Sequence, residues 1–395
     1  MTPPRPHPFT RSKLAERANR MIALIWERGW DDQPPLEPEY LWRLGSKGYS
    51  REDEISVRSE EDVADFRLRL EKLCASLQDA GLNALGHTMA YGQLKGAIRT
   101  RHALGRLWRE KPEMAETSIA PPIIVLGQMR SGTTRVQRLL AADPQFCGTR
   151  FCDSHDPVPS RPDVRPLKTR AALFLARRLN PWLDTTHPFG ATRTDEEIGW
   201  LAAALSPAAF EAQWCIASFL EFSEPRDASP VYREFARILR TDAAFHGNAK
   251  RPRVLKCPQF AEDLPALLAQ FPDARIIHCQ RDHEDVLASS VSMVASQMAF
   301  QGGTHDVADL ESEWRRKIAL RETRMAEALA TFTGPVATVR FEKLNANWQA
   351  CMADTYATLG LDFTAGARSK MAEELAGSQE AAHTQHKAQL EAFAN

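Results

Sequence analysis

The stretch Pro121-Pro-Ile-Ile-Val-Leu-Gly127-Gln-Met-Arg130-Ser131-Gly132-Thr133-Thr134 decides how this chain folds. Its apolar run, residues 123–126, predicts a buried strand of a parallel sheet, and the pattern from Thr133 onward predicts a helix. Gly127 and Gly132 frame the turn between them, where they permit backbone that a side chain would obstruct. Because the free N–H groups at the start of a helix attract negative charge, this turn predicts a cradle for an anion.

The cradle lacks the lysine of the ordinary nucleotide-binding loop. In that loop the residue after the second glycine is Lys, followed by a Ser or Thr that reaches Mg²⁺. Here Thr133 takes the place of the lysine, and the cation, Arg130, comes two residues before Gly132. We therefore expect Arg130 to bind the anion, helped by backbone or hydroxyl groups of Ser131, Gly132, Thr133 and Thr134.

The rest of the chain predicts an α/β fold. Three further strand candidates, residues 253–255, 275–279 and 335–340, are separated by helical runs. This alternation is typical of a P-loop-like, doubly wound parallel sheet flanked by helices. An irregular, proline-rich excursion over about residues 151–250 interrupts it, and we expect this insertion to supply contacts to a substrate.

Residues 1–118 carry helical periodicity and no convincing strand. Ser59 and Asp62 resemble a capping box, and the apolar positions that follow lie on one helix face. A boundary near residue 118 would divide this region, a lid or a surface for homo-oligomer formation, from an α/β domain over residues 119–395.

Composition excludes several classes of partner. Lys and Arg total 50 against 51 Asp and Glu in 395 residues, so the net charge of −1 gives no reason to expect nucleic acid or an anionic membrane. The seven cysteines form no CxxC pair, which argues against a disulfide framework or a zinc ribbon and favours a reducing compartment. No run of about 18 apolar residues occurs, and we expect a soluble, cytoplasmic protein.

A second anchor for an anion follows the strand candidate at 275–279. Arg281 stands at the end of that strand, and Ser289 lies eight residues later in the expected helix. An arginine and a hydroxyl in these places could hold a second phosphate. Lys256 directly follows another strand candidate, which places its ammonium at the sheet edge where α/β proteins bind ligands.

The order of these motifs resembles the sulfotransferase superfamily, specifically the bacterial-type family related to tyrosylprotein and carbohydrate sulfotransferases. The resemblance implies 3′-phosphoadenosine 5′-phosphosulfate (PAPS) as donor and 3′-phosphoadenosine 5′-phosphate (PAP) as product, with no metal. It implies that the Gly127–Thr134 loop binds the 5′ group and that Arg281 with Ser289 binds the 3′-phosphate. It also implies that Lys256 stabilises the transferring sulfonate.

The chain departs from the family pattern near the expected acceptor site. Cys152-Asp153 replaces the usual Trp-Glu, and Lys256-Cys-Pro-Gln-Phe260 replaces Lys-x-Pro-x-His. By position, Asp153 is the first candidate for the general base, and His155 is the second because its ordinary pKa suits the task. His187 and the pair Glu196-Glu197 are further candidates. Asp153 could instead cap a turn, and the glutamates could form the first turn of a helix.

Together these patterns predict an enzyme that moves a sulfonate from PAPS to a hydroxyl or amine of a small-molecule or glycan acceptor. Two alternatives stay open. One is an ATP-dependent small-molecule kinase with a variant phosphate loop, against which the missing lysine argues. The other is a non-catalytic PAPS-binding protein, for which the altered acceptor-side positions argue.

Overall fold

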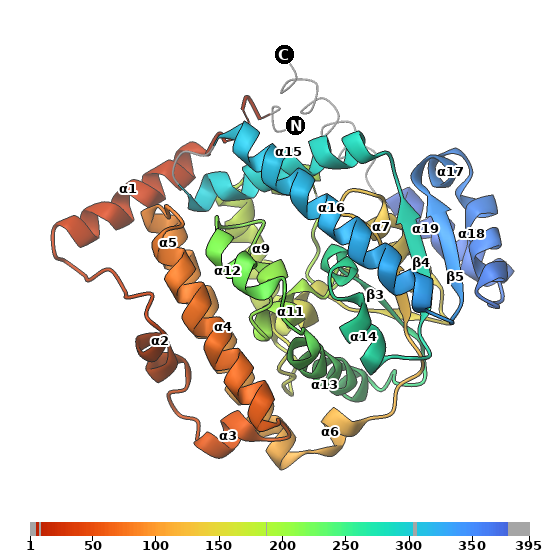
Figure 1. Ribbon diagram of the computed structural model, residues 1–395, viewed down its shortest axis with the longest axis horizontal. Helices are drawn as coiled ribbons and strands as arrows, with labels where there is room; N and C mark the ends of the chain where they lie inside the picture. The colour runs from red at the N-terminus through yellow and green to blue at the C-terminus, as the bar shows by residue number, and fades with distance from the viewer. Residues whose placement is uncertain (1–4, 8, 187, 303–305, 378–395) are drawn as a thin grey trace.

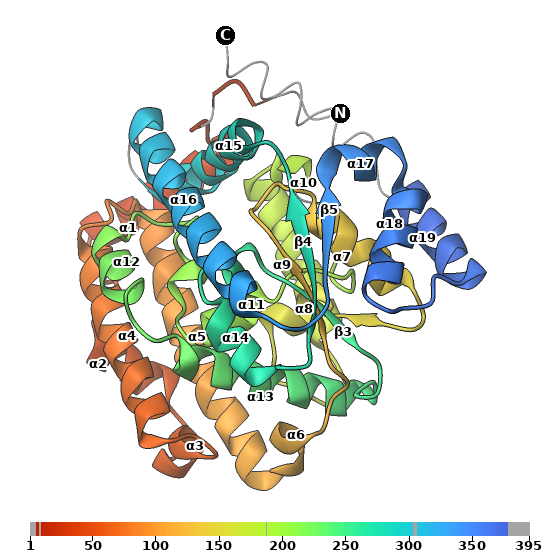
Figure 2. The same cartoon turned by 45° about the vertical axis from the view of Figure 1, so that its right-hand side comes forward.

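The fold is built on a five-stranded parallel sheet. The computed structural model describes residues 5–7, 9–186, 188–302 and 306–377. The strands run in the order β2-β3-β1-β4-β5, so successive strands are joined by crossovers that carry helices (Figures 1 and 2). Their bounds are β1 Ile123–Leu126, β2 Cys147–Gly148, β3 Arg253–Lys256, β4 Arg275–Gln280 and β5 Val336–Arg340. This architecture confirms the predicted α/β class.

Alternate residues of the central strand face two separate cores. Ile123 and Val125 point to one core, and Ile124 and Leu126 point to the other, with all four fully buried. A strand that is covered on both faces needs the continuous apolar run seen here.

Helices cover both faces of the sheet. The first core is closed by α7 (Thr133–Ala142), α17 (Phe341–Ala346), α18 (Trp348–Thr358) and α19 (Ala365–Gly377). The second is closed by α5 (Ala84–Glu110), α6 (Glu113–Glu116), α11 (Ile198–Ala203), α13 (Ser229–His246), η2 (Pro258–Ala261), α14 (Leu264–Gln270) and α16 (Val307–Thr331).

The N-terminal helices lie on the side of the molecule away from α17–α19 (Figure 1). They are α1 (Lys13–Glu27), α2 (Pro38–Gly45), α3 (Arg51–Ile55) and α4 (Glu60–Gln78). Ser59 accepts a hydrogen bond from the Asp62 N–H and so caps α4, as its sequence predicts. The apolar core that α2 and α4 form with α5 also contains Phe210, Trp214 and Phe219 from the insertion, near η1 (Pro207–Ala209) and in α12 (Ala217–Ser223). The N-terminal region therefore shares its core with the α/β part.

Four further helices belong to the described part of the chain. They are α8 (Phe151–His155), α9 (Arg165–Leu179), α10 (Leu183–Thr186) and α15 (His283–Gln301). In the parts of the chain that the structure describes, no helix has both the length and the apolar composition needed to cross a membrane.

Two short segments differ from what the sequence led us to expect. The two-residue strand β2 was not predicted, because so short a segment carries no periodicity. Glu196 and Glu197 precede α11 instead of forming its first turn, since the helix begins at Ile198. The segment after β5 forms two helices, α17 and α18, which meet at Asn347.

Candidate active site

The two glycines of the cradle are required by the packing around them. Gly127 has φ +146°, and a Cβ atom there would lie 2.6 Å from the carbonyl oxygen of Cys279 in β4. Gly132 has φ +89°, and a Cβ atom there would lie 2.9 Å from the Phe341 ring. The loop can approach β4 and α17 this closely only because both positions lack a side chain.

Arg130 adopts the left-handed conformation, which is unusual for a residue with a side chain. Its φ is +66°, and its Nε donates a 2.9 Å hydrogen bond to the Ser289 hydroxyl in α15. The preceding residue, Met129, packs against apolar side chains of α15 and α16 and so anchors the loop. Backbone strain of this kind is concentrated at functional sites.

Arg281 brings a second guanidinium to the same loop. Its Nη1 donates to the carbonyl oxygen of Arg130 at 3.0 Å, and its Cζ lies 4.4 Å from the centre of the Phe341 ring. Its Nη2 lies 3.1 Å from a carboxylate oxygen of Asp285, which is mostly exposed. Its Nε is buried and has no hydrogen-bond partner among the described residues. Burial, reinforced by the charge of Arg281, lowers the pKa of Arg130 to about 10. A bound polyanion would reduce the repulsion between Arg130 and Arg281 and would accept a hydrogen bond from the Arg281 Nε atom.

The first turn of α7 begins three residues after Arg130. Gly132 is its N-cap residue, and no side chain of the described residues caps it, so the first N–H groups are open to an anion. Ser131 uses its hydroxyl to donate a 2.6 Å hydrogen bond to the carbonyl of Gln128, which closes the turn. The side chain of Thr133 is buried and that of Thr134 is half-buried. The structure therefore brings the predicted residues 127–134, Arg281 and Ser289 together.

Lys256 lies beside the cradle in the neighbouring strand. It pairs in register with Val125, two residues before Gly127. Its ammonium is buried and forms a 2.5 Å ion pair with Glu196, while its backbone N–H donates to Glu197 at 2.8 Å. Burial opposes the charge of Lys256, but the attraction of Glu196 and Asp195 outweighs it and raises the pKa. The ammonium is thus a permanent cation at this edge of the sheet.

Glu197 is a fully buried carboxyl group. Desolvation raises its pKa to about 8, and the hydrogen bond from the Lys256 N–H only partly offsets that effect. The side chain therefore ties α11 to β3 largely in its neutral form at pH 7.

His155 ends α8 close to residues 195–197, the acidic segment that precedes α11. Its ring is exposed and stands 4.3 Å from the Phe151 ring, centre to centre. Desolvation by the surrounding protein lowers its pKa, against the attraction of Asp195 and Glu196. Gly199 permits this arrangement, because a Cβ atom there would lie 2.2 Å from the carbonyl oxygen of Ser154.

Asp153 lies in an ion-pair network. Its carboxylate accepts hydrogen bonds of 2.6 and 2.8 Å from Arg150, lies 3.0 Å from Arg165 and accepts a 3.1 Å bond from His246. Burial alone would raise its pKa, but His246 and the two arginines hold it well below its ordinary range. The N–H of the buried Trp200 indole donates to the Asp153 carbonyl at 2.9 Å. This environment favours a structural role for Asp153 over the predicted role of general base.

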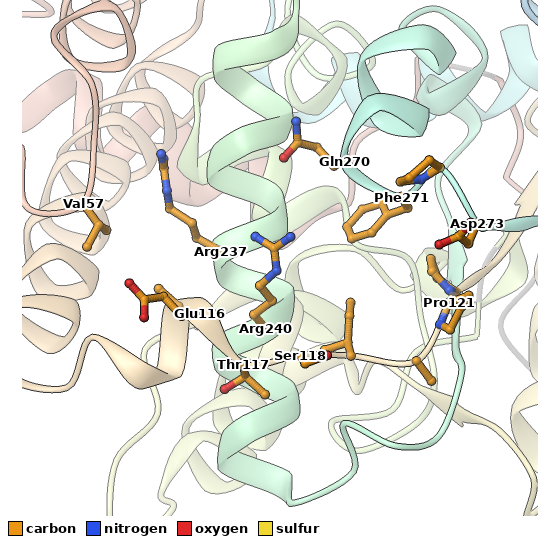
Figure 3. A pocket seen from close by; sticks show the side chains of 15 residues that line it. Val57, Glu116, Thr117, Ser118, Pro121, Arg237, Arg240, Gln270, Phe271 and Asp273 are labelled. Carbon is orange, nitrogen blue, oxygen red and sulfur yellow. The ribbon is translucent and has the colours of Figure 1, made fainter.

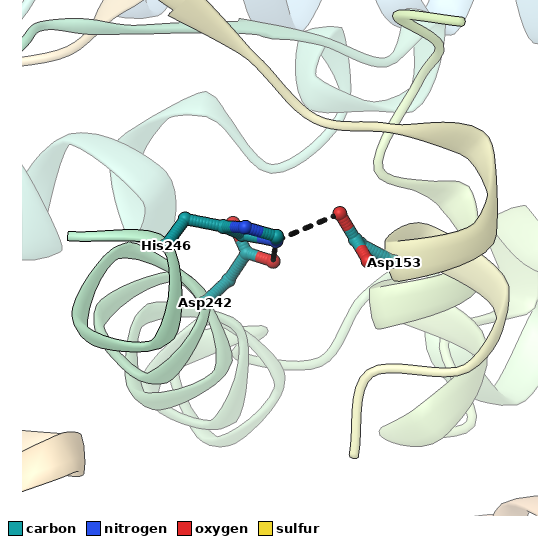
Figure 4. Close-up of side chains that lie close together, drawn as sticks. All are labelled: Asp153, Asp242 and His246. Carbon is teal, nitrogen blue, oxygen red and sulfur yellow. Dashed lines mark hydrogen bonds and ion pairs between the residues drawn. The ribbon is translucent and has the colours of Figure 1, made fainter. Parts of the chain in front are cut away.

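Asp153, Asp242 and His246 have ligand atoms within 4.8 Å of one another, a spacing that a metal site would share (Figure 4). Arg150 and Arg165 already neutralise Asp153, and Arg253 pairs with Asp242 at 2.6 Å. Hydrogen bonds to the two aspartates raise the pKa of His246 to about 9. Because a protonated imidazole cannot bind a metal, we interpret this cluster as an ion-pair network.

Of the other candidates for the general base, Glu196 is the one that forms an ion pair with the buried Lys256. In the sequence it was marked only by its position beside Glu197. His187 lies outside the described residues. Phe210, Trp200 and Trp214 are almost wholly buried and belong to the apolar cores, as ordinary packing predicts.

A pocket of about 630 Å³ lies at the opposite edge of the sheet, where β1 and β4 begin (Figure 3). Its lining includes two positively charged side chains, Arg237 and Arg240, and two negatively charged ones, Glu116 and Asp273. None of the predicted site residues lines it.

Comparison with known proteins identifies the family. The sequence profile described as the sulfotransferase family matches residues 121–365, which is more than half of the chain. The chain belongs to the sulfotransferase family. This sulfotransferase is therefore a transferase enzyme, and the match includes the cradle, Lys256, Arg281 and Ser289.

Two solved structures share the fold of this sulfotransferase. The sulfotransferase STF1 from Mycobacterium tuberculosis H37Rv aligns with a TM-score of 0.77 and 24% identity, covering 92% of this chain and 99% of that one. The sulfotransferase STF9 from Mycobacterium avium aligns with a TM-score of 0.76 and 19% identity, covering 89% and 90%. No curated protein sequence matches the chain significantly.

Proposed function

We propose that this sulfotransferase moves a sulfonate group from PAPS to a hydroxyl or amine of a small-molecule or glycan acceptor. The observation that carries the proposal is the convergence of Arg130, Arg281 and Ser289 on one glycine-framed loop. The two positions that we propose bind phosphate are far apart in the sequence but adjacent in the fold. A donor with two anionic groups requires such an arrangement.

The residues present fit such a donor. The Nε atom of Arg281 is a buried donor without a partner, and the first N–H groups of α7 are uncapped. Arg281 and Ser289 would hold the 3′-phosphate, and the 127–134 loop with Arg130 would hold the 5′ phosphosulfate. The donor supplies an activated sulfonate on a phosphate leaving group.

The protein's task in such a transfer is positioning and charge stabilisation. Arg130 and the N–H groups of α7 would offset the charge that develops on the leaving phosphate. Lys256, at the end of β3, would offset charge on the sulfonate oxygens. A sulfonate carries less charge than a terminal phosphate, which suits a loop with an arginine and no phosphate-loop lysine.

We also propose a reducing, cytoplasmic location. All seven cysteines are free thiols, and five of them are buried. Proteins of oxidising compartments more often pair their cysteines.

Titration calorimetry with PAP in EDTA tests the donor assignment. We expect the wild-type enzyme to bind PAP, and Arg281→Ala to weaken binding about 100-fold, since a buried charge-assisted contact to phosphate is lost. Failure of the wild type to bind, or equal binding by the variant, would overturn the assignment. Mg²⁺-dependent binding of ATP instead of PAP would favour the kinase alternative. A metabolite-extract screen for mass gain of one sulfonate would then identify the acceptor.

A further inference from the structure

We propose that Glu196, and not Asp153, is the general base that takes the proton from the acceptor, and that Lys256 holds its carboxylate until the donor binds. This inference rests on the proposed sulfonate transfer and adds the identity of a catalytic residue to it. Four features of the structure support it. The Asp153 carboxylate is enclosed by ion pairs, whereas the Glu196 carboxylate is partly exposed. The Glu196 backbone is held by hydrogen bonds, and Lys256 lies in the strand next to the cradle.

Both carboxylate oxygens of Asp153 are already engaged by partners within the protein. Arg150 donates to both of its carboxylate oxygens, and Arg165 and His246 add one contact to each. Its side chain is 1% exposed, so an acceptor hydroxyl cannot reach it without displacing these partners. A general base must lie within hydrogen-bond reach of the proton that it removes.

Glu196 meets that requirement. Its side chain is 25% exposed, and its ion-pair partner among the described residues is the buried Lys256. Its Oε2 atom contacts the Lys256 ammonium at 2.5 Å, and no hydrogen bond to its Oε1 atom is found in the described part of the chain. The carboxylate is thus both accessible and held in one orientation.

The backbone of Glu196 is fastened to the cradle helix and to α8. Gln137 of α7 donates a 3.0 Å hydrogen bond to the carbonyl of Asp195, and the Ser154 hydroxyl donates to the carbonyl of Glu196 at 2.8 Å. Arg138 of α7 donates to the carbonyl of Thr194 at 3.1 Å. The acidic segment therefore keeps its position relative to the helix that opens at the cradle. Catalytic groups need such support.

Lys256 connects Glu196 to the place where the sulfonate would lie. Its strand neighbour is Val125, in the strand that leads into the cradle, and its ammonium contacts Glu196. Lys256 therefore joins this carboxylate to the strand beside the cradle. A sulfonate brought beside this ammonium would compete with Glu196 for the positive charge, which would release the carboxylate to accept a proton.

The acceptor O–H or N–H transfers its proton to Glu196 as the acceptor atom forms a bond to sulfur. The bond between sulfur and the bridging oxygen of the donor breaks, and its electron pair stays on the 5′-phosphate of PAP. The positive charges of Arg130 and Lys256 persist throughout, so no metal or further co-reactant enters the scheme.

The test compares Glu196→Gln with wild type, using PAPS and a panel of phenols, primary alcohols and amines. We expect PAP release with the best acceptor to fall at least 100-fold, the usual range for loss of a general base, while PAP affinity stays within threefold. In Glu196→Ala, added formate should restore part of the turnover, because a small carboxylate can occupy the vacated space. A purely structural role would not respond to formate.

Glu224→Gln is the matched control. Glu224 also pairs with a buried lysine, Lys317, at 3.0 Å, but it lies at the end of α12, outside the cradle and the acidic segment. The same change of charge there should leave turnover unaltered. Asp153→Asn should keep turnover per folded molecule while lowering the melting temperature.

Two results would overturn the inference: turnover of Glu196→Gln within threefold of wild type, or loss of turnover in Asp153→Asn or His155→Gln with PAP affinity intact and Glu196→Gln active. Failure of the proposed function is distinct from both. In that case the wild-type enzyme itself would bind no PAP and would release none from PAPS with any acceptor.

Discussion

Arg130 Nε donates a 2.9 Å hydrogen bond to Ser289 Oγ, across 159 residues of sequence. The bond joins the loop after β1 to the helix after β4, and these two strands are neighbours in the sheet. Arg281 in turn donates to the carbonyl of Arg130. Two motifs that the sequence shows separately thus come together at one loop.

Loss of the Ser289 hydroxyl should weaken PAP binding. In Ser289→Ala, Arg130 loses the hydrogen bond to this hydroxyl and, in the proposed binding mode, the 3′-phosphate loses a donor, so we expect about a tenfold rise in the Kd for PAP by calorimetry. Ser290→Ala is the neighbouring control, since the buried Ser290 hydroxyl has no partner among the described residues. Equal effects of the two changes would contradict the role given to Ser289.

A methyl group at Gly127 should disrupt the cradle. In Gly127→Ala the new Cβ would lie 2.6 Å from the Cys279 carbonyl oxygen, at a φ of +146°. We expect a loss of about 2 kcal/mol or more in the free energy of unfolding by urea denaturation, with weaker PAP binding. Gly92→Ala, in α5 with no atom within 4 Å of the new Cβ, should instead stabilise the protein by up to about 1 kcal/mol. Unchanged stability of Gly127→Ala would refute the packing argument.

Lys256→Met should separate turnover from product binding. PAP lacks the sulfonate, so its Kd should stay within about threefold, while turnover of PAPS should fall at least 100-fold because charge stabilisation of the sulfonate is lost. Single-turnover assays with the panel of acceptors, alongside calorimetry, provide the measurement. A large loss of PAP affinity would mean that Lys256 binds the nucleotide instead.

The Asp153 network should make stability depend on pH above neutrality. The pKa of His246 is raised from its ordinary value of 6.5 to about 9, because the protonated imidazole donates to Asp153 and Asp242. The stabilisation is therefore complete below about pH 6.5 and is lost as pH rises through about 9. A shift of this size corresponds to about 3 kcal/mol at most.

Thermal unfolding of wild type and His246→Gln between pH 6 and 10 measures this effect. The variant should be less stable at pH 6 and should lack most of the decline between pH 6.5 and 9. His283→Gln, which changes a partly exposed histidine of α15, should retain the wild-type profile. Parallel profiles for wild type and His246→Gln would show that His246 is not the titrating group.

The sequence by itself determined the central strand, the cradle and the class of fold. A buried strand in a parallel sheet needs an unbroken apolar run, and a tight turn into a helix needs glycines, so both features are readable over about 14 consecutive residues. That Arg281 and Ser289 would lie near each other at one end of the sheet could also be predicted, because eight residues span a strand end and the first turns of one helix. These features depend on local backbone geometry.

Only the tertiary structure decided which charges surround the acidic residues near the expected acceptor site. Asp153 stands at the position that the family pattern favours, yet Arg165 and His246, brought in from α9 and α13, enclose its carboxylate. Glu196 lies 60 residues from Lys256 in sequence and meets it only because the segment before α11 lies against the end of β3. The availability of a carboxylate depends on which charges the fold places around it. Those neighbours come from distant segments whose packing no local pattern records.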